Sequence, residues 1–193
     1  ERVLGGATYI ATALSAPGLI EQTGTHRKIV FGEVFGDRSR VSDRVSTLGQ
    51  LMEAADIEIE TVADARRRLW EKLIYLCPFA SFTGAARSPI GKLWSDADTR
   101  ERFMAAVREV EAVARAEGVK VSDEVTKDIR AYMEALPPAT RSSMLIDLSQ
   151  GKRIEVEALQ GTIVRRGQRL GVPTPIVGAH YAVLKPHAGG APA

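Results

Sequence analysis

One lysine stands inside an otherwise apolar run, in the octapeptide Trp70–Cys77, which reads WEKLIYLC. On a helix, the residues three and four positions from Lys72 share its face, and three of these four are apolar or aromatic. An ammonium that is partly desolvated there has a lowered pKa, and it can donate a proton or hold a carbonyl oxygen. The alternative is a surface lysine whose stem lies on apolar residues while its charge stays in water.

Three acidic residues and one serine form the next candidates. Ser143 and Asp147 are spaced so that a helix presents both on one face, which suits a small polar ligand. The alternative is a solvated face with a local hydrogen bond. Glu155 and Glu157 are two residues apart, so on a helix they point in different directions and cannot act as a close carboxylate pair. The alternative for these two is a favourable interaction with the start of a helix dipole.

Several other kinds of site are excluded or disfavoured by spacing. The chain contains no G-x-G-x-x-G, so it has no dinucleotide phosphate loop of its own. His26, His180 and His187 lack metal-ligand spacing with the acids or with Cys77. A lone cysteine in an apolar run is typical of a buried small hydrophobe rather than a nucleophile. The run Arg66–Arg68 is typical of a solvated helix turn, with nucleic-acid binding as a minor alternative.

Composition narrows the class of protein. The chain has 193 residues, of which 45% are hydrophobic and 26% charged, as in an ordinary soluble globular protein. The net charge of +2 favours neither a nucleic acid nor a membrane surface as partner. No apolar stretch reaches the roughly 18 residues of a membrane span, and there is no signal peptide. One cysteine allows no internal disulfide, which fits a reducing, cytoplasmic setting.

The elements that must position these residues change type along the chain. The first third reads as β structure with one helix: a strand over 7–14, a turn at 15–18, a hairpin over 19–31, a helix over 43–55 and a strand over 57–62. The remainder reads as about six helices, over 63–76 up to Pro78, 95–117, 122–135, 140–150, 155–170 and 175–184. The predicted fold class is therefore an α+β fragment with a mainly α-helical C-terminal domain. The predicted boundary lies near residue 62, and residues 187–193 are expected to be a disordered tail.

A set of short motifs appears in a distinctive order. They are Pro17-Gly-Leu-Ile, Phe31-Gly-Glu33, Leu69-Trp-Glu-Lys72, Glu109 ahead of Ala114-x-x-x-Gly118, Ser142-Ser-Met-Leu-x-Asp147, Gly151-Lys-x-x-Glu155, Gln160-Gly161 and Gly171-Val-Pro-Thr-Pro175. This series resembles the ketopantoate reductases, also called 2-dehydropantoate 2-reductases, over residues 1 to about 186. The elements W-x-K and S-S-M-x-x-D-x-x-x-G-x-x-x-E carry most of the specificity.

The resemblance implies a two-domain enzyme of pantothenate biosynthesis, on the coenzyme A pathway. Family members have an N-terminal Rossmann domain that binds NADPH and a C-terminal helical domain. Residues 1–62 would then be the end of the NADP-binding domain, and residues 63–186 the substrate and dimerisation domain of a homodimer. The chain does not begin with Met, so the Gly-rich loop is expected upstream of Glu1, and the chain alone is expected not to bind the full cofactor.

The resemblance also assigns roles to residues at matching positions. Lys72 matches the general acid that protonates the ketone oxygen of a 2-oxo acid as hydride arrives from the nicotinamide. Glu155 matches a glutamate near the cofactor and the substrate oxygen. Ser143 matches the serine that contacts the substrate carboxylate, and Asp147, one turn on, is a further candidate for substrate contact. A backbone contact with the cofactor is expected near Thr12.

The chain departs from the family pattern at several polar positions. Well-known members carry substrate-binding asparagines where this chain has Leu76, Ala80 and Ile90, and their Asn-Gly pair is Gln160–Gly161 here. A site that loses such hydrogen-bonding partners loses discrimination for hydroxyl groups. We therefore expect a reductase of a less polar 2-oxo acid, with Leu76 and Ala80 among the residues that contact the substrate. A different class, a non-catalytic helical dimerisation module, is the alternative that the lost asparagines favour.

Overall fold

The computed structural model describes residues 2–191 of the chain. The chain divides into two compact units, Glu1–Leu69 and Trp70–Ala193. The division falls inside a long helix, whereas the sequence pattern places the boundary near residue 62, where helical periodicity begins. Each unit is described below by itself.

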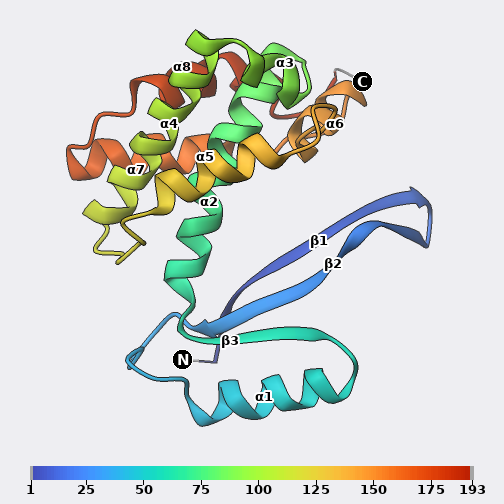
Figure 1. The fold of residues 1–193 in the computed structure, drawn as a ribbon, viewed down its shortest axis with the longest axis vertical. Helices are drawn as coiled ribbons and strands as arrows, with labels where there is room; N and C mark the ends of the chain where they lie inside the picture. The colour runs from blue at the N-terminus through green and yellow to red at the C-terminus, as the bar shows by residue number, and fades with distance from the viewer. Residues whose placement is uncertain (1, 192–193) are drawn as a thin grey trace. The chain divides into compact units, whose positions relative to one another are not determined.

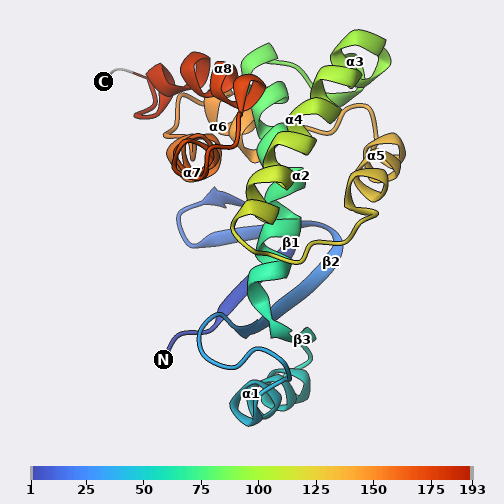
Figure 2. The same cartoon turned by 90° about the vertical axis from the view of Figure 1, so that its left-hand side faces the viewer.

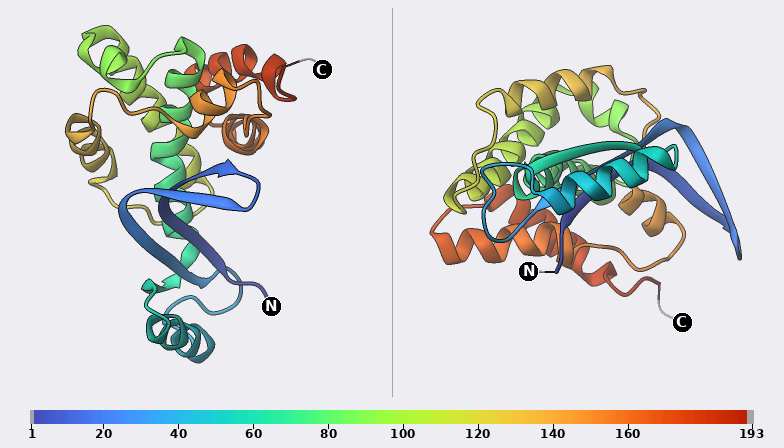
Figure 3. Two further views of the ribbon diagram at one scale, coloured as in Figure 1. Left: turned by 90° about the vertical axis from the view of Figure 1, so that its right-hand side faces the viewer. Right: turned by 90° about the horizontal axis from the view of Figure 1, so that it is seen from below.

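The N-terminal unit is a three-stranded sheet with one helix. Strand β1 (Gly5–Ala16) pairs antiparallel with β2 (Leu19–Glu33), and β2 pairs parallel with β3 (Glu58–Asp64), in the order β1-β2-β3. Helix α1 (Asp43–Ala54) lies alongside β3, as Figure 1 and the right panel of Figure 3 show. A parallel pair joined by a helix is typical of α/β domains. The few strands and one helix that precede the helical unit agree with the predicted α+β fragment.

The predicted hairpin over residues 19–31 is wrong. Strand β2 is continuous, and its hairpin partner is β1, with the turn between Ala16 and Leu19. The register shifts between the pairs Ile10↔Arg27 and Thr12↔Gln22. The glycine-containing stretch between Gln22 and Arg27 therefore makes an irregularity in one strand, as glycine commonly does inside strands, rather than a turn.

The motif Phe31-Gly-Glu33 holds this unit together. A methyl group on Gly32 would lie 2.0 Å from the carbonyl oxygen of Val62, so the close approach of β2 and β3 requires glycine. The Glu33 carboxylate is 5% exposed and accepts hydrogen bonds from Arg44 Nε at 2.8 Å and Ser42 Oγ at 2.7 Å. Arg44 and then Ser42 lower the pKa of Glu33 from 4.5 to about 2. Because Ser42 is also the N-cap of α1, the motif joins β2 to the start of that helix.

The second unit is a helical bundle. Its elements are α2 (Ala65–Ala86, which contains the division between the units), α3 (Ile90–Ser95), α4 (Ala97–Ala116), α5 (Val125–Ala135), α6 (Ser143–Ser149), a π-helical turn (Glu157–Gly161), α7 (Thr162–Leu170), α8 (Pro175–Leu184) and a 3₁₀ turn (Lys185–His187). Within this unit α2 and α4 run through the centre, with α5 on one side and α7 and α8 on the other (Figures 2 and 3). This confirms the predicted helical C-terminal part. Over the described residues, no helix has the length and apolar character needed to cross a membrane.

Helix α2 does not end before Pro78, as the sequence predicts, but continues to Ala86. A proline inside a helix costs about 3 kcal/mol because it removes a hydrogen bond and crowds the preceding turn. The residues of α2 that are buried in the core are Trp70, Ile74, Cys77, Phe79 and Phe82. Burial of one large apolar side chain contributes about 1.5–3 kcal/mol, so the packing of α2 outweighs the proline.

Glu109, one of the motif residues, caps another helix. Its carboxylate accepts hydrogen bonds from the backbone amides of Ile176 and Val177, both at 2.9 Å. These amides belong to the first turn of α8, where Thr174 provides no side-chain cap. The motif positions at Glu109 and Pro175 therefore meet in space, and their contact is structural.

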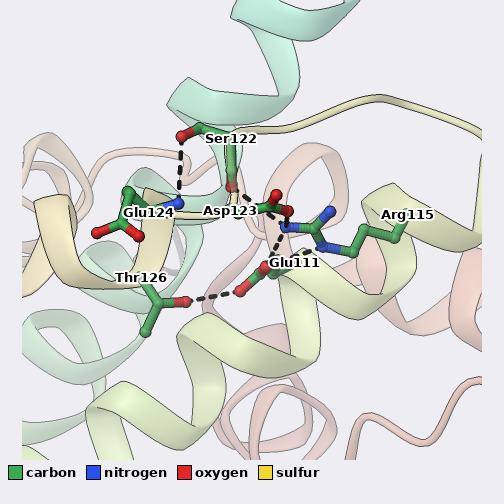
Figure 4. Close-up of polar contacts among 6 residues, drawn as sticks. All are labelled: Glu111, Arg115, Ser122, Asp123, Glu124 and Thr126. Atoms are coloured by element: carbon green, nitrogen blue, oxygen red, sulfur yellow. Dashed lines mark hydrogen bonds and ion pairs between the residues drawn. The ribbon is translucent and has the colours of Figure 1, made fainter.

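The connection from α4 to α5 is held by a polar cluster (Figure 4). Glu111 accepts hydrogen bonds from Arg115 Nε at 2.9 Å and from Thr126 Oγ1 at 2.6 Å. Arg115 Nη2 also donates to the Ser122 carbonyl oxygen at 3.2 Å. Ser122 is the first residue of the helix predicted over 122–135, but its hydroxyl oxygen accepts from the amide of Glu124 in the turn before the helix, and α5 begins three residues later.

The tail is ordered over the part that the structure describes. The Ala188 carbonyl oxygen accepts from the amide of Ile154 at 3.3 Å, and the amide of Ala191 donates to the Gly151 carbonyl oxygen at 2.9 Å. The prediction of a disordered tail is therefore wrong for residues 187–191, because this segment finds backbone partners in the loop after α6. Residues 192–193 lie outside the described part of the chain.

Candidate functional site

Lys72 and Glu155 interact electrostatically within the helical unit. Lys72 lies in α2 and is half-buried, and Glu155 is exposed on an irregular segment before the π-helical turn, so the predicted helix over 155–170 begins later than the sequence indicates. Burial lowers the pKa of Lys72, and the Glu155 carboxylate opposes this change without cancelling it. A partly desolvated ammonium near a carboxylate can donate a proton and can stabilise a developing oxyanion. The role of Lys72 as a proton donor stays a prediction.

Trp70 anchors the segment of α2 that carries the lysine. Trp70 is 9% exposed, and the guanidinium of Arg166 lies 5.7 Å from the centre of its ring. Arg166 Nη1 in turn donates to Glu117 Oε1 at 2.7 Å, which links α7 to the end of α4. Residues two apart on a helix do not share a face, so the tryptophan is held in the bundle while Lys72 projects elsewhere.

Gln160 fixes the turn that follows Glu155. Its side chain is fully buried, and Nε2 donates to Ser81 Oγ at 2.9 Å and to the Cys77 carbonyl oxygen at 3.3 Å, both on α2. The backbone carbonyl of Glu155 accepts from the amide of Leu159 at 3.0 Å. The π-helical turn is therefore tied to the same helix that carries the lysine, and such turns are frequent at functional sites. The sequence alone identifies Gln160 only as a polar residue beside a glycine.

Glu157 has a different role from Glu155, as their spacing predicts. Its carboxylate accepts from Tyr181 Oη at 2.7 Å and from Arg165 Nη1 at 2.6 Å, which joins the turn to α7 and α8. A methyl group on Gly161 would lie 2.8 Å from both Arg165 Nη1 and Glu157 Oε2. The glycine therefore makes room for this ion pair, which is the packing explanation for a glycine inside a helix.

Helix α6, which carries Ser143 and Asp147, docks on the C-terminal half of α2. The Ser142 hydroxyl donates to Thr83 Oγ1 at 2.6 Å, Thr83 Oγ1 donates to the Phe79 carbonyl oxygen at 2.6 Å, and Ser142 Oγ caps α6. From the helical rise, Thr83 lies about 16 Å along α2 from the lysine. Ser143 is exposed and Asp147 half-buried, so both polar groups are accessible. Which ligand they contact stays a prediction.

The three apolar residues that stand in place of the family asparagines lie in different surroundings. Ala80 is 1% exposed and belongs to a buried cluster with Met144 and Leu148, and Ile90 is also 1% exposed. Both side chains are covered by protein, which argues against the predicted contact of Ala80 with a substrate. Leu76 is half-buried one turn after the lysine, so it is the replacement that borders the candidate site.

The remaining candidates lie apart from this chemistry. Thr12 is exposed on β1, in the other unit, and its expected contact with a cofactor stays a prediction. Cys77 is fully buried, and burial raises the pKa of its thiol to about 12, which confirms the prediction of a structural cysteine. The centre of the His180 ring lies 4.3 Å from the centre of the Phe82 ring, and burial lowers the pKa of His180. Within residues 2–191, no group of three His, Cys, Asp or Glu could hold a metal ion.

Known proteins match this chain over most of its length. The family model described as "Ketopantoate reductase PanE/ApbA C terminal" matches residues 64–188. A 2-dehydropantoate 2-reductase from Caulobacter vibrioides is 33% identical, over 95% of this chain and 60% of its own. A crystal structure of a PanE/ApbA family ketopantoate reductase from Ralstonia eutropha JMP134 is 31% identical with a TM-score of 0.84, over 96% of this chain and 59% of its own. A 2-dehydropantoate 2-reductase structure from Geobacter metallireducens is 26% identical with a TM-score of 0.86, over 96% and 61%. The chain spans 55–60% of the length of the first curated relatives that it matches.

Proposed function

Since the chain belongs to the ketopantoate reductase family, we propose that it is the substrate-side part of an NADPH-dependent reductase of a 2-oxo acid. The reaction would be of the ketopantoate-to-pantoate type, a step of pantothenate biosynthesis. The observation that supports this most directly is the half-buried Lys72, whose pKa is lowered by burial and is influenced by the charge of the Glu155 carboxylate.

Lys72 is proposed to act as the general acid. The nicotinamide supplies hydride to the carbonyl carbon when it is bound. As negative charge develops on the carbonyl oxygen, Nζ of Lys72 donates a proton to it, and the resulting amine is reprotonated from solvent. A lowered pKa makes this ammonium a better proton donor, while the Glu155 carboxylate favours its charged form.

The donor set of the chain fits one end of such a cofactor. Lys72 can supply the proton that carbonyl reduction needs, with Glu155 as a nearby carboxylate, while the chain contains no G-x-G-x-x-G to hold the phosphates. We therefore assign the phosphates to a nucleotide-binding domain that precedes these residues in the protein, with a backbone contact near Thr12. Glu155 would lie near the nicotinamide end.

The proposed substrate contacts come from α6 and α2. The Ser143 hydroxyl would bind the substrate carboxylate, and Asp147 would accept a hydrogen bond from a polar group of the substrate, since two carboxylates repel. Leu76, beside the lysine, leaves one wall of the site apolar. A 2-oxo acid with an apolar side chain therefore fits better than ketopantoate.

The test uses the chain joined to its nucleotide-binding domain. NADPH oxidation is followed with ketopantoate and with 2-oxo acids of increasing apolar side chain. We expect turnover that Lys72→Ala abolishes, and that Lys92→Ala, a substitution at an exposed lysine of α3, leaves unchanged. Equal turnover in the two variants would remove the lysine from the mechanism.

A helical dimerisation module without catalysis is the second candidate. The loss of the family asparagines at Leu76, Ala80 and Ile90 favours it. Light scattering would show a homodimer under either function, so the deciding result is activity. A dimer that oxidises no NADPH with any 2-oxo acid supports the module.

A further inference from the structure

A basic hollow lies at the C-terminal corner of the helical unit, and none of the residues assigned above to catalysis lines it. Its volume is about 670 Å³, within the usual range of small-molecule sites. Its lining includes the basic residues Arg87, Lys152 and His187 and the glycines Gly151, Gly189 and Gly190. The set contains three residues that can carry positive charge and no acid.

The three basic side chains come from separate segments. Arg87 follows α2, Lys152 follows α6, and His187 ends the 3₁₀ turn. Within residues 2–191, none of the three side chains forms a hydrogen bond or an ion pair. Other cations of the unit, such as Arg115 and Arg165, are paired with carboxylates. Unpaired like charges around one hollow repel each other, and a bound anion would relieve that repulsion.

Glycines allow two backbone segments to pack closely in the wall of the hollow. Gly190 has φ of 88°, and a methyl group on it would lie 2.6 Å from the Gly151 carbonyl oxygen. Backbone hydrogen bonds from Ile154 to Ala188 and from Ala191 to Gly151 hold the tail against the loop after α6. The hollow is therefore built by tertiary contacts, and it does not depend on loose surface side chains alone.

We propose that this hollow binds a phosphate-class anion, held by Arg87, Lys152 and His187. The planar guanidinium can bind two phosphate oxygens at once, while the ammonium and the imidazole approach as single donors. Three donors from different segments suit a tetrahedral group with several acceptor oxygens better than a planar carboxylate. The volume leaves space for the remainder of a phosphate ester. The site stands independently of the proposed reductase function, because it shares none of the residues assigned to catalysis.

Isothermal titration calorimetry of the intact protein in phosphate-free, low-salt buffer tests the site. The probes are inorganic phosphate, phenyl phosphate and pyruvate, with no nucleotide or substrate present. We expect saturable binding at one site for the two phosphates, with pyruvate at least tenfold weaker. Tighter binding of phenyl phosphate assigns the site to phosphate esters, and equal binding assigns it to the phosphate group alone.

Three variants and one control locate the binding. Lys152→Gln and His187→Gln each remove a donor, and we expect each to weaken phosphate binding at least tenfold. Arg87→Gly removes a donor at a position with φ of 52°, where glycine is free of strain, so this variant is expected to fold and to lose binding similarly. Lys120→Gln removes an exposed lysine outside the hollow and should leave binding unchanged.

Amide shifts in ¹⁵N-labelled protein provide the second measurement. Phosphate should shift the amide resonances of Gly189 and Gly190, and these shifts should saturate at the same phosphate concentration as the heat measured by calorimetry. No saturable binding by either method overturns the proposal. So does an equal loss of binding in Lys120→Gln and Lys152→Gln, or pyruvate binding as tight as phosphate binding.

Discussion

Glu33 in the N-terminal unit is a buried charged residue and Lys72 in the helical unit is a half-buried one, and their surroundings act in opposite directions. Arg44 and Ser42 stabilise the charged form of Glu33 and lower its pKa to about 2. Burial disfavours the charged form of Lys72, and Glu155 compensates only in part. A charge whose environment favours it holds a fold together, whereas a charge that its environment disfavours is available for chemistry.

The largest expected effect concerns Lys72 in the assembled enzyme. Lys72→Met should lower turnover by about 10²–10⁴-fold, the usual contribution of a general acid. The melting temperature should stay the same or rise. The folded-state pKa of the lysine is lowered, so the unfolded chain binds the proton more tightly, and the native state gains stability as pH rises toward 10.5. Methionine removes this proton-linked cost at neutral pH.

Turnover assays and calorimetric melting on the same sample check this prediction. Lys120→Met is the control, as a lysine exposed to solvent. A Lys72→Met protein that melts well below the wild type would place the lysine with Glu33, as a structural charge.

Two glycines give the next largest contrast. Gly32→Ala should destabilise the protein by roughly 3 kcal/mol or more, because its methyl group would lie 2.0 Å from the Val62 carbonyl oxygen, and backbone cannot yield as a side chain does. Gly161→Ala meets side-chain ends at 2.8 Å, on Arg165 and Glu157. These can move, so a cost of about 1 kcal/mol is expected. Urea unfolding of both variants measures the loss of unfolding free energy. Equal losses would contradict the distinction between a contact with backbone and a contact with side-chain ends.

The stability of the N-terminal unit should fall at low pH because Glu33 becomes protonated. Its folded-state pKa lies below the ordinary value of 4.5, so the folded state binds the proton less tightly than the unfolded chain does. The resulting stability is complete above pH 4.5 and is lost as pH falls to about 2. Glu33→Gln should flatten this part of the pH profile. Unfolding followed by circular dichroism between pH 7 and pH 2 measures it, and a parallel fall in both proteins would assign the acid sensitivity elsewhere.

The smallest effect is expected at Arg166, which acts on Lys72 only through Trp70. Arg166→Met removes the contact with the indole ring and the bond to Glu117, which together should cost about 1 kcal/mol. Turnover should fall by less than tenfold, because Trp70 stays packed by its other neighbours. A loss of turnover as large as that of Lys72→Met would show that the arginine itself takes part in the chemistry.

Local patterns were sufficient for much of the fold. Phe103, Val107, Val110 and Ala114 follow helical spacing and are all buried in α4. Gly118 follows the end of this helix with φ of 76°, the left-handed conformation that a glycine after a helix commonly adopts. These features depend on residues within a few positions of each other, so periodicity and glycine placement predict them.

Features that depend on distant partners were missed. The sequence predicts a break at Pro78, but the core contacts of α2 carry the helix through it. It predicts a hairpin within residues 19–31, but β1 supplies the partner for the whole of β2. It predicts a disordered tail, but the loop at Gly151 binds the described part of that tail. In each case tertiary contacts outweigh a local preference of a few kcal/mol.

The sequence by itself determined which groups are candidates for chemistry: Lys72 in an apolar helix, Glu155 at the start of a predicted helix, and Ser143 and Asp147 on one helical face. Only the tertiary structure decided their surroundings. It placed Glu155 where its charge acts on the lysine, it set α6 against the far half of α2 through Thr83 and Ser142, and it gathered basic residues of three segments around one hollow. The physical reason is that spacing along a chain defines a face, whereas the pKa of a charge depends on burial and on neighbours that are remote in sequence.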